Sequence, residues 1–169
     1  DVMDVIEPGT KANLTDLCAV IGLSQLGQLD AITARRARLA EIWFEAAARA
    51  LAPTNAERPS DAQVIGAVAR VRGGEDSIVV CAAGGLPGEL HKLWVPVKAG
   101  GYHMEYGFSC MGYEIAGGIG VKMARPEADV VVMVGDGSYM MLNSEIATSV
   151  MLGQKITIVL LDNHGLGCI

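Results

Sequence analysis

The segment Val130-Val131-Val132-Met133-Val134 runs directly into Gly135-Asp136-Gly137-Ser138, and this junction decides the fold. A run of apolar, mostly β-branched residues predicts a strand that is buried on both faces, as in a parallel sheet. We expect Gly135 and Gly137 to form a turn that lets another group approach the backbone closely. We expect Ser138 to cap the next helix, whose free N–H groups would attract an anion.

A second strand end carries a matching set of polar residues. The run Ile156–Leu161 predicts another strand, and Asp162-Asn163-His164-Gly165 follows it. Because ligands bind at the carboxyl ends of strands in open α/β sheets, we expect Asp136 and Asn163 to lie close together there. Carboxylate and amide oxygens suit Mg²⁺, whose coordination is completed by water and phosphate oxygens. The two segments predict a magnesium–diphosphate site, and the alternative interpretation is a pair of ordinary tight turns.

Strands and helices alternate from residue 60 onwards, which predicts the fold class. A further strand is expected at Ser77–Ala82, after a helix that starts at the capping box Ser60-Asp61-Ala62-Gln63. A glycine-rich turn is expected at 84–88 and a loop at 95–109, with helices at Glu89–Trp94, Met111–Met123 and Tyr139–Leu152. The pattern predicts an α/β domain with an open parallel sheet flanked by helices. Because the chain ends where another helix is due, we expect this sheet to be incomplete at the C-terminus.

The first 59 residues have a different character, and we expect residues 1–59 to be a linker and helical lead-in to a domain at 60–169. A short helix is expected at Asn13–Ile21, and Gly22 and Gly27 are expected to bound a loop. A second, amphipathic helix is indicated by apolar residues at helical spacing, namely Leu39, Ile42, Trp43 and Ala46. We expect its apolar face to pack on a larger body.

The composition excludes several classes of partner. The net charge is −6 and no run of Lys or Arg occurs, so we expect no binding to nucleic acid or to membranes. No apolar run approaches the roughly 18 residues of a membrane span. The N-terminus lacks the basic start of a signal peptide. The 4 cysteines form no C-x-x-C pair, which favours free thiols in a reducing cytoplasm.

The helix expected at Met111–Met123 is rich in glycine, at Gly112, Gly117, Gly118 and Gly120. Each glycine in a helix interior costs about 0.8–1 kcal/mol relative to alanine, so together they would cost roughly 3–4 kcal/mol. We expect the close approach of another backbone or of a ligand to offset this loss.

The residues at the strand ends resemble those of a known enzyme family. Gly135-Asp136-Gly137, with Asn163 at the next strand end, resembles the diphosphate-binding motif of thiamine diphosphate enzymes, which include acetohydroxyacid synthase and pyruvate decarboxylase. The resemblance implies that thiamine diphosphate binds with Mg²⁺, and that Asp136, Asn163 and the main-chain oxygen of Gly165 hold the metal. It also implies a set of cofactor-binding residues: Gly84, Gly85, Met111, Gly135, Gly137, Ser138, His164 and Gly165.

Met111 has a particular role in this resemblance. Ser109-Cys110-Met111-Gly112 is similar to the segment that places a bulky apolar side chain under the cofactor and holds its two rings in a bent conformation. The alternative is that Met111 is an ordinary core methionine. His103 and Glu105 in the preceding loop are further candidates to line the pocket, whereas His91 is expected to be structural.

The resemblance narrows within the family. Residues 83–94, 102–107 and 135–169 are most similar to members that hydrolyse a C–C bond of a cyclic 1,2-dione, opening its ring to a deoxyglucuronate in myo-inositol breakdown. Acetohydroxyacid synthases usually have a proline where this chain has Glu114-Ile115-Ala116. The resemblance covers residues 60–169 well and the first 60 poorly. It also implies that a glutamate on a neighbouring subunit activates the cofactor, so no catalytic residue is expected in this chain.

Three functions stay open on the sequence alone. The first is the diphosphate-binding half-site of such a hydrolase, a cytoplasmic homo-oligomer (dimer or tetramer) acting on a small cyclic dione. The second is another thiamine diphosphate lyase or synthase, such as an acetohydroxyacid synthase. The third is a catalytically inert association module, because an exposed apolar sheet edge favours self-association.

Overall fold

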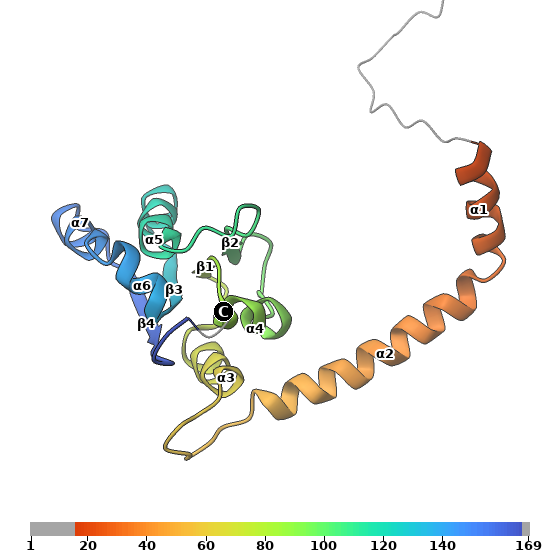
Figure 1. Ribbon diagram of the computed structural model, residues 1–169, viewed down its shortest axis with the longest axis horizontal. Coiled ribbons are helices and arrows are strands. Elements are labelled where there is room, and N and C mark those ends of the chain that lie inside the picture. The colour runs from red at the N-terminus through yellow and green to blue at the C-terminus, as the bar shows by residue number, and fades with distance from the viewer. Residues whose placement is uncertain (1–15, 167–169) are drawn as a thin grey trace, which may run out of the picture. The chain divides into compact units, whose positions relative to one another are not determined.

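The computed structural model describes residues 16–166, and the chain divides into two units, Asp1–Glu45 and Ala46–Ile169 (Figure 1). Helix α1 (Asp16–Leu26) lies in the first unit, and helix α2 (Leu29–Ala50) begins there. The expected loop from Gly22 to Gly27 is wrong at its start, because Gly22 lies inside α1 and the chain turns only at Gly27. A glycine weakens a helix by only about 1 kcal/mol, so the hydrogen-bond ladder continues through it.

The apolar face expected on α2 is present but uncovered in the described part of the chain. Leu39, Ile42 and Trp43 keep 56%, 54% and 47% of their surface exposed. No described residue of α2 is buried. Within residues 16–166, no helix combines the length and the apolar character that a membrane-spanning helix requires.

The second unit is built on a parallel sheet with the strand order β2-β1-β3-β4. The strands are β1 (Ser77–Cys81), β2 (Tyr102–Met104), β3 (Asp129–Gly135) and β4 (Thr157–Leu161). The helices are α3 (Asp61–Arg72), α4 (Gly85–Leu93), α5 (Tyr113–Ala124), α6 (Asp136–Leu142) and α7 (Glu145–Met151). The predicted α/β fold with an open parallel sheet flanked by helices is confirmed. The capping box of α3 is also present, with Gln63 and Ser60 bonded in both directions.

The core has two layers, one on each face of the sheet. Val79 and Met133 point to the layer formed with Ile65 of α3 and Leu90 of α4. Ile78, Val80 and the alternate residues of β3 point to the other layer, where α5 contributes Ile115 and Ile119. Both strands are buried on both faces, as expected for the centre of a parallel sheet. Figure 1 shows α3 and α4 on one side of the sheet and α5 on the other.

Several element boundaries differ from those expected. Gly135 has an extended backbone and takes the N-cap position, so α6 starts at Asp136 and the Gly-Asp-Gly-Ser segment is largely helical rather than a turn. Likewise α4 begins at Gly85, within the expected glycine-rich turn. The helix expected at Tyr139–Leu152 is broken into α6 and α7. Strand β2 lies within the segment that was expected to be a loop. Its pairing with β1 defines it as a strand, and three residues are too few to show an alternating pattern in the sequence.

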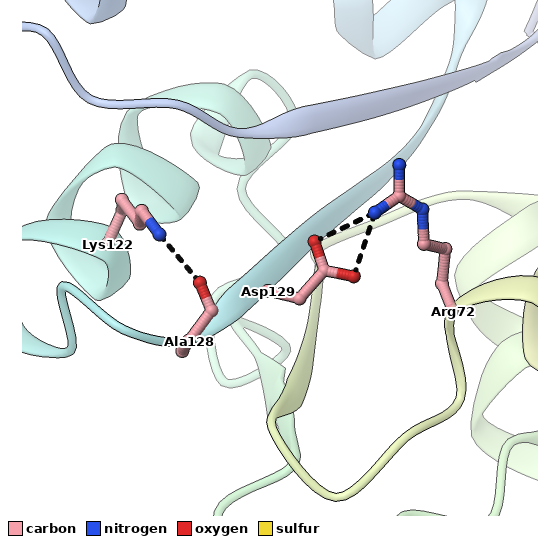
Figure 2. Close-up of polar contacts among 4 residues, drawn as sticks. All are labelled: Arg72, Lys122, Ala128 and Asp129. Carbon is pink, nitrogen blue, oxygen red and sulfur yellow. Dashed lines mark hydrogen bonds and ion pairs between the residues drawn. The ribbon is translucent and has the colours of Figure 1, made fainter.

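Polar contacts hold the amino end of β3, the end away from the strand-end motifs. Arg72 of α3 donates to both carboxylate oxygens of Asp129, at 3.2 and 3.3 Å, and Lys122 of α5 donates to the Ala128 carbonyl at 2.7 Å (Figure 2). The Arg72–Asp129 pair is about 40% exposed on each side. Such a pair contributes only about 0.2–1 kcal/mol, so its main effect is to fix where β3 enters between the helices.

The glycines of α5 have different surroundings. A Cβ at Gly118 would lie 2.4 Å from Val132 Cγ2, so this glycine lets α5 lie close to β3, although the neighbour is a side chain and not the backbone or ligand that was expected. A Cβ at Gly117 would lie 2.4 Å from the ring of Tyr113. No described atom lies within 4 Å of a Cβ at Gly120, so close approach does not explain that glycine.

Replacing Gly118 by alanine is expected to destabilise the domain by about 1–3 kcal/mol, because the new methyl would overlap a side chain of the buried sheet. Gly120→Ala is the matched control on the same helix and should stabilise by about 0.4–1 kcal/mol through the lower entropy of the unfolded chain. Urea denaturation measures both changes. Equal stabilities for the two variants would contradict this packing of α5 on β3.

Candidate functional site

A pocket opens at the carboxyl ends of β1 and β3, where the sequence predicted a ligand. It encloses about 440 Å³, part of which is open to solvent. The residues that line it are Ala83, Gly84, Gly85, Leu86, Pro87, Met111, Gly135, Asp136, Gly137, Ser138, Gly165 and Leu166. All the predicted cofactor-binding residues except His164 are among them. The fold therefore gathers residues from four separate parts of the chain at one sheet edge.

Glycine backbone forms much of the pocket wall. Gly84 has a φ of +121°, in a region that residues with a side chain rarely adopt. A Cβ at Gly137 would lie 2.3 Å from Leu166 Cδ2 and 3.6 Å from Met111 Cε, so a side chain there would fill the pocket. A wall of bare backbone suits a diphosphate, whose oxygens accept hydrogen bonds from main-chain N–H groups.

Asp136 supplies a carboxylate to this pocket from the first position of α6. Its Oδ2 accepts a hydrogen bond from the backbone N–H of Gly165 at 2.9 Å, which ties the loop after β4 to the end of β3. The loop is tightly bent, with φ of +62° at His164 and +149° at Gly165. The carboxylate is a hard oxygen donor of the kind that Mg²⁺ prefers, so the donor chemistry fits a metal–diphosphate.

Asn163 and His164 lie elsewhere on that loop. Both line a neighbouring groove together with Arg58, Asp61 and Asp162. The His164 side chain is 90% exposed, and its Nδ1 lies 3.1 Å from Asp162 Oδ1. The structure thus brings Gly165, but not Asn163, into the pocket with Asp136. No cluster of three or more His, Cys, Asp or Glu side chains that could hold a metal occurs within residues 16–166. A metal beside Asp136 would therefore need amide or main-chain oxygens as well.

Met111 is partly buried and lines the pocket at the end of the loop before α5. Gly112 follows it with a φ of +89°, in the left-handed region. A Cβ at Gly112 would lie 3.2 Å from Met141 Cβ of α6, so the two helices meet closely at this turn. This position matches a pocket wall better than the interior of the core.

Glu105 holds the loop that leads to Met111. Its carboxylate accepts the backbone N–H of Cys110 at 2.7 Å and that of Phe108 at 3.0 Å. These bonds, that of Cys110 first, lower the pKa of Glu105 from its usual value. Glu105 therefore binds its own loop instead of lining the pocket. His103 lies in another groove, where its Nε2 is 2.5 Å from the Tyr113 hydroxyl.

Sequence reasoning missed the part played by Glu114, which is 1% exposed behind the pocket. Both of its carboxylate oxygens lie 2.7 Å from Ser138 Oγ, and Oε2 also accepts the N–H of Gly112 at 3.1 Å. Burial raises the pKa of Glu114, and the hydrogen bond from Ser138 opposes that rise. Helical spacing could have indicated that Glu114 is buried. Glu114 lies four residues before Gly118 and therefore on the same face of α5, the face that packs on β3.

Similar proteins are known among bacterial enzymes. Over 95 residues, or 56% of its length, the chain is 58% identical to the 3D-(3,5/4)-trihydroxycyclohexane-1,2-dione hydrolase of Geobacillus thermodenitrificans. It is 57% identical to the protein of the same name from Bacillus thuringiensis and 55% identical to that from Clostridium tetani over the same length. The chain spans only about 15% of the length of each of these relatives.

Two family models match different parts of the chain. Residues 2–75 are similar to the DegT/DnrJ/EryC1/StrS aminotransferase family, a match that covers less than half of the chain. Residues 82–169 match the C-terminal TPP binding domain of thiamine pyrophosphate enzymes, and this match covers more than half. It includes β3, α6 and all the residues that line the pocket. The chain therefore belongs to the thiamine pyrophosphate enzyme family.

Proposed function

We propose that residues 60–169 form the domain that binds the diphosphate of thiamine diphosphate in an enzyme that hydrolyses a C–C bond of a cyclic 1,2-dione. The observation that carries the proposal is the glycine-walled pocket with the Asp136 carboxylate at its edge. The names of the relatives support trihydroxycyclohexane-1,2-dione as the substrate. Its hydrolysis to 5-deoxyglucuronate in inositol catabolism, in the cytoplasm, is the proposed role of the whole protein.

Mg²⁺ is the metal proposed for this pocket, with Asp136, Asn163 and the main-chain oxygen of Gly165 as its protein ligands. The hydrogen bond from Gly165 to Asp136 supports this assignment, because it attaches the loop carrying both other ligands to the end of β3. Ligands of this type leave coordination sites for diphosphate oxygens and water. His164, which lies on the same loop, is a further proposed contact of the cofactor.

The surrounding residues bind, orient and exclude water. Gly84, Gly85 and Gly137 present backbone where a diphosphate needs N–H donors, and Met111 forms an apolar wall for the rings of the cofactor. Leu86, Pro87 and Leu166 add apolar surface. When bound, thiamine diphosphate would supply the electron sink that cleavage of a C–C bond beside a carbonyl requires.

The activating glutamate is proposed to come from another domain on a neighbouring subunit of a homo-oligomer. The local roles of this chain's carboxylates support that view. Glu89 pairs with Lys92 at 2.7 Å, Glu105 binds its own loop, and Glu145 begins α7, where a negative charge favours the helix N-terminus. Glu114 is enclosed by Gly112 and Ser138.

Another thiamine diphosphate lyase or synthase, such as an acetohydroxyacid synthase, is the second candidate. The family match over residues 82–169 fits both candidates, and the names of the relatives favour the hydrolase. The exposed apolar residues of α6 and α7, including Met140 and Met151, fit the third candidate, in which the 169 residues alone only associate.

Asp136→Ala in the intact protein should weaken binding of thiamine diphosphate by about tenfold or more in the presence of Mg²⁺, because the carboxylate ligand is lost. Calorimetric titration with and without Mg²⁺ measures the dissociation constant. Asp76→Ala is the matched control, because Asp76 precedes β1 at the amino end of the sheet and its side chain is 78% exposed. Binding that needs no metal and survives Asp136→Ala would exclude the proposed metal site.

The intact protein should hydrolyse trihydroxycyclohexane-1,2-dione and should lose this activity when thiamine diphosphate is removed. Product formation from the dione and from pyruvate is measured side by side. The 169-residue chain alone should be inactive, because the activating glutamate lies outside it. Turnover of pyruvate without turnover of the dione would favour the synthase alternative.

A further inference from the structure

A buried hydrogen-bonded cluster joins the two walls of the pocket, which are the turn that carries Met111 and the start of α6 that carries Asp136. It consists of Glu114, Ser138 and the backbone N–H of Gly112. The two side chains are 1% and 3% exposed. None of these groups has a role in the metal and diphosphate contacts beyond the placement of Ser138 in the pocket wall. A buried carboxylate is costly to desolvate, so this cluster requires its own explanation.

The hydrogen bonds of the cluster form a closed set. The Gly112 N–H donates to Ser138 Oγ at 2.7 Å and to Glu114 Oε2 at 3.1 Å. The Ser138 hydroxyl donates a hydrogen bond to the Glu114 carboxylate, whose oxygens both lie 2.7 Å away. The carboxylate accepts from both neighbours, which is the pattern expected of an acceptor-only group.

Each partner in the cluster is next to a residue that lines the pocket. Gly112 follows Met111 directly, and Ser138 lies two positions after Asp136 in the first turn of α6. The backbone at Gly112 also lies against Met141 of α6, 3.2 Å from where its Cβ would be. The carboxylate of Glu114 therefore connects the turn that carries Met111 to the helix start that carries Asp136.

We propose that Glu114 is a positioning residue that sets the spacing between Met111 and Asp136, and so matches the pocket to a ligand having both an apolar ring system and a diphosphate. The role acts through Gly112 and Ser138, and Glu114 itself does not touch the ligand. The inference rests on the proposed function, because it assigns the rings to the Met111 side and the diphosphate to the Asp136 side.

A purely structural role predicts something different. If Glu114 only stabilised the domain, its loss would weaken every ligand of the pocket to the same degree. If Glu114 sets the spacing of the two walls, its loss weakens a ligand that touches both walls more than one that touches a single wall. Inorganic diphosphate is the single-wall probe, and thiamine diphosphate is the probe that needs both.

The test is calorimetric titration of the intact protein with thiamine diphosphate and, separately, with inorganic diphosphate, both with Mg²⁺. Glu114→Gln keeps the side-chain shape but presents an N–H₂ group to donors that need an acceptor. We expect it to raise the dissociation constant of thiamine diphosphate about tenfold, and that of inorganic diphosphate by about twofold at most. In the protein without ligand, the Gly112 amide should exchange its hydrogen faster, measured by hydrogen–deuterium exchange.

Two further variants make the result decisive. Ser138→Ala removes the second member of the cluster, and its effect on thiamine diphosphate binding should be non-additive with that of Glu114→Gln. It is also the substitute if Glu114→Gln does not fold. Ser149→Ala is the matched control, because this serine of α7 is also buried and donates a hydrogen bond to the carbonyl of Gln154 after the end of that helix, and it does not line the pocket. We expect it to leave both dissociation constants unchanged.

The outcomes separate the inference from the proposed function. If the wild-type protein binds neither ligand, the proposed function fails and the inference fails with it. If the wild type binds both ligands and Glu114→Gln weakens them equally, or weakens neither, only the positioning role of Glu114 is overturned. Selective weakening of thiamine diphosphate, with faster exchange at Gly112, supports the role.

Discussion

The parallel pairing of β1 with β3 is the constraint on which the rest of the second unit depends. Val79 pairs with Val131 and Val80 with Val132, so the two strands run in register through the centre of the sheet. Both strands bury both faces, which requires a layer of helices on each side. The same pairing brings the carboxyl ends of the strands to one edge, where β3 ends at Gly135 and the chain after β1 reaches Gly84 within three residues.

The pocket forms at that edge of the sheet because few side chains occupy the space beyond the strand ends. Gly84, Gly135 and Gly137 leave the strand ends as bare backbone, and the Gly165 N–H closes on the Asp136 carboxylate from the next strand. Such a surface can hold an anion by main-chain donors. The pocket thus combines a base of fully buried strands with a wall whose chemistry is mostly that of the peptide group.

At Glu114, desolvation and hydrogen bonding have opposite effects on the pKa of the carboxyl group. Burial raises the pKa of its carboxyl, while the Ser138 hydroxyl and the Gly112 N–H favour the charged form. Replacing such a group by an apolar one of similar size is often neutral or stabilising, whereas removing one partner alone is costly. A buried carboxylate is therefore weak as a source of stability, and what Glu114 provides is a fixed geometry between the Gly112 turn and the start of α6.

The sequence by itself determined the α/β class, the buried central strands and the residues of the strand ends, because apolar runs and glycines act through local backbone preference and burial. It placed the start of α6 too late and missed β2, since a cap and a short edge strand depend on the backbone around them. Only the tertiary structure decided that Glu114 is buried and that Gly165 rather than Asn163 faces Asp136. Those contacts join residues far apart in the chain, and no local pattern encodes the distance between them.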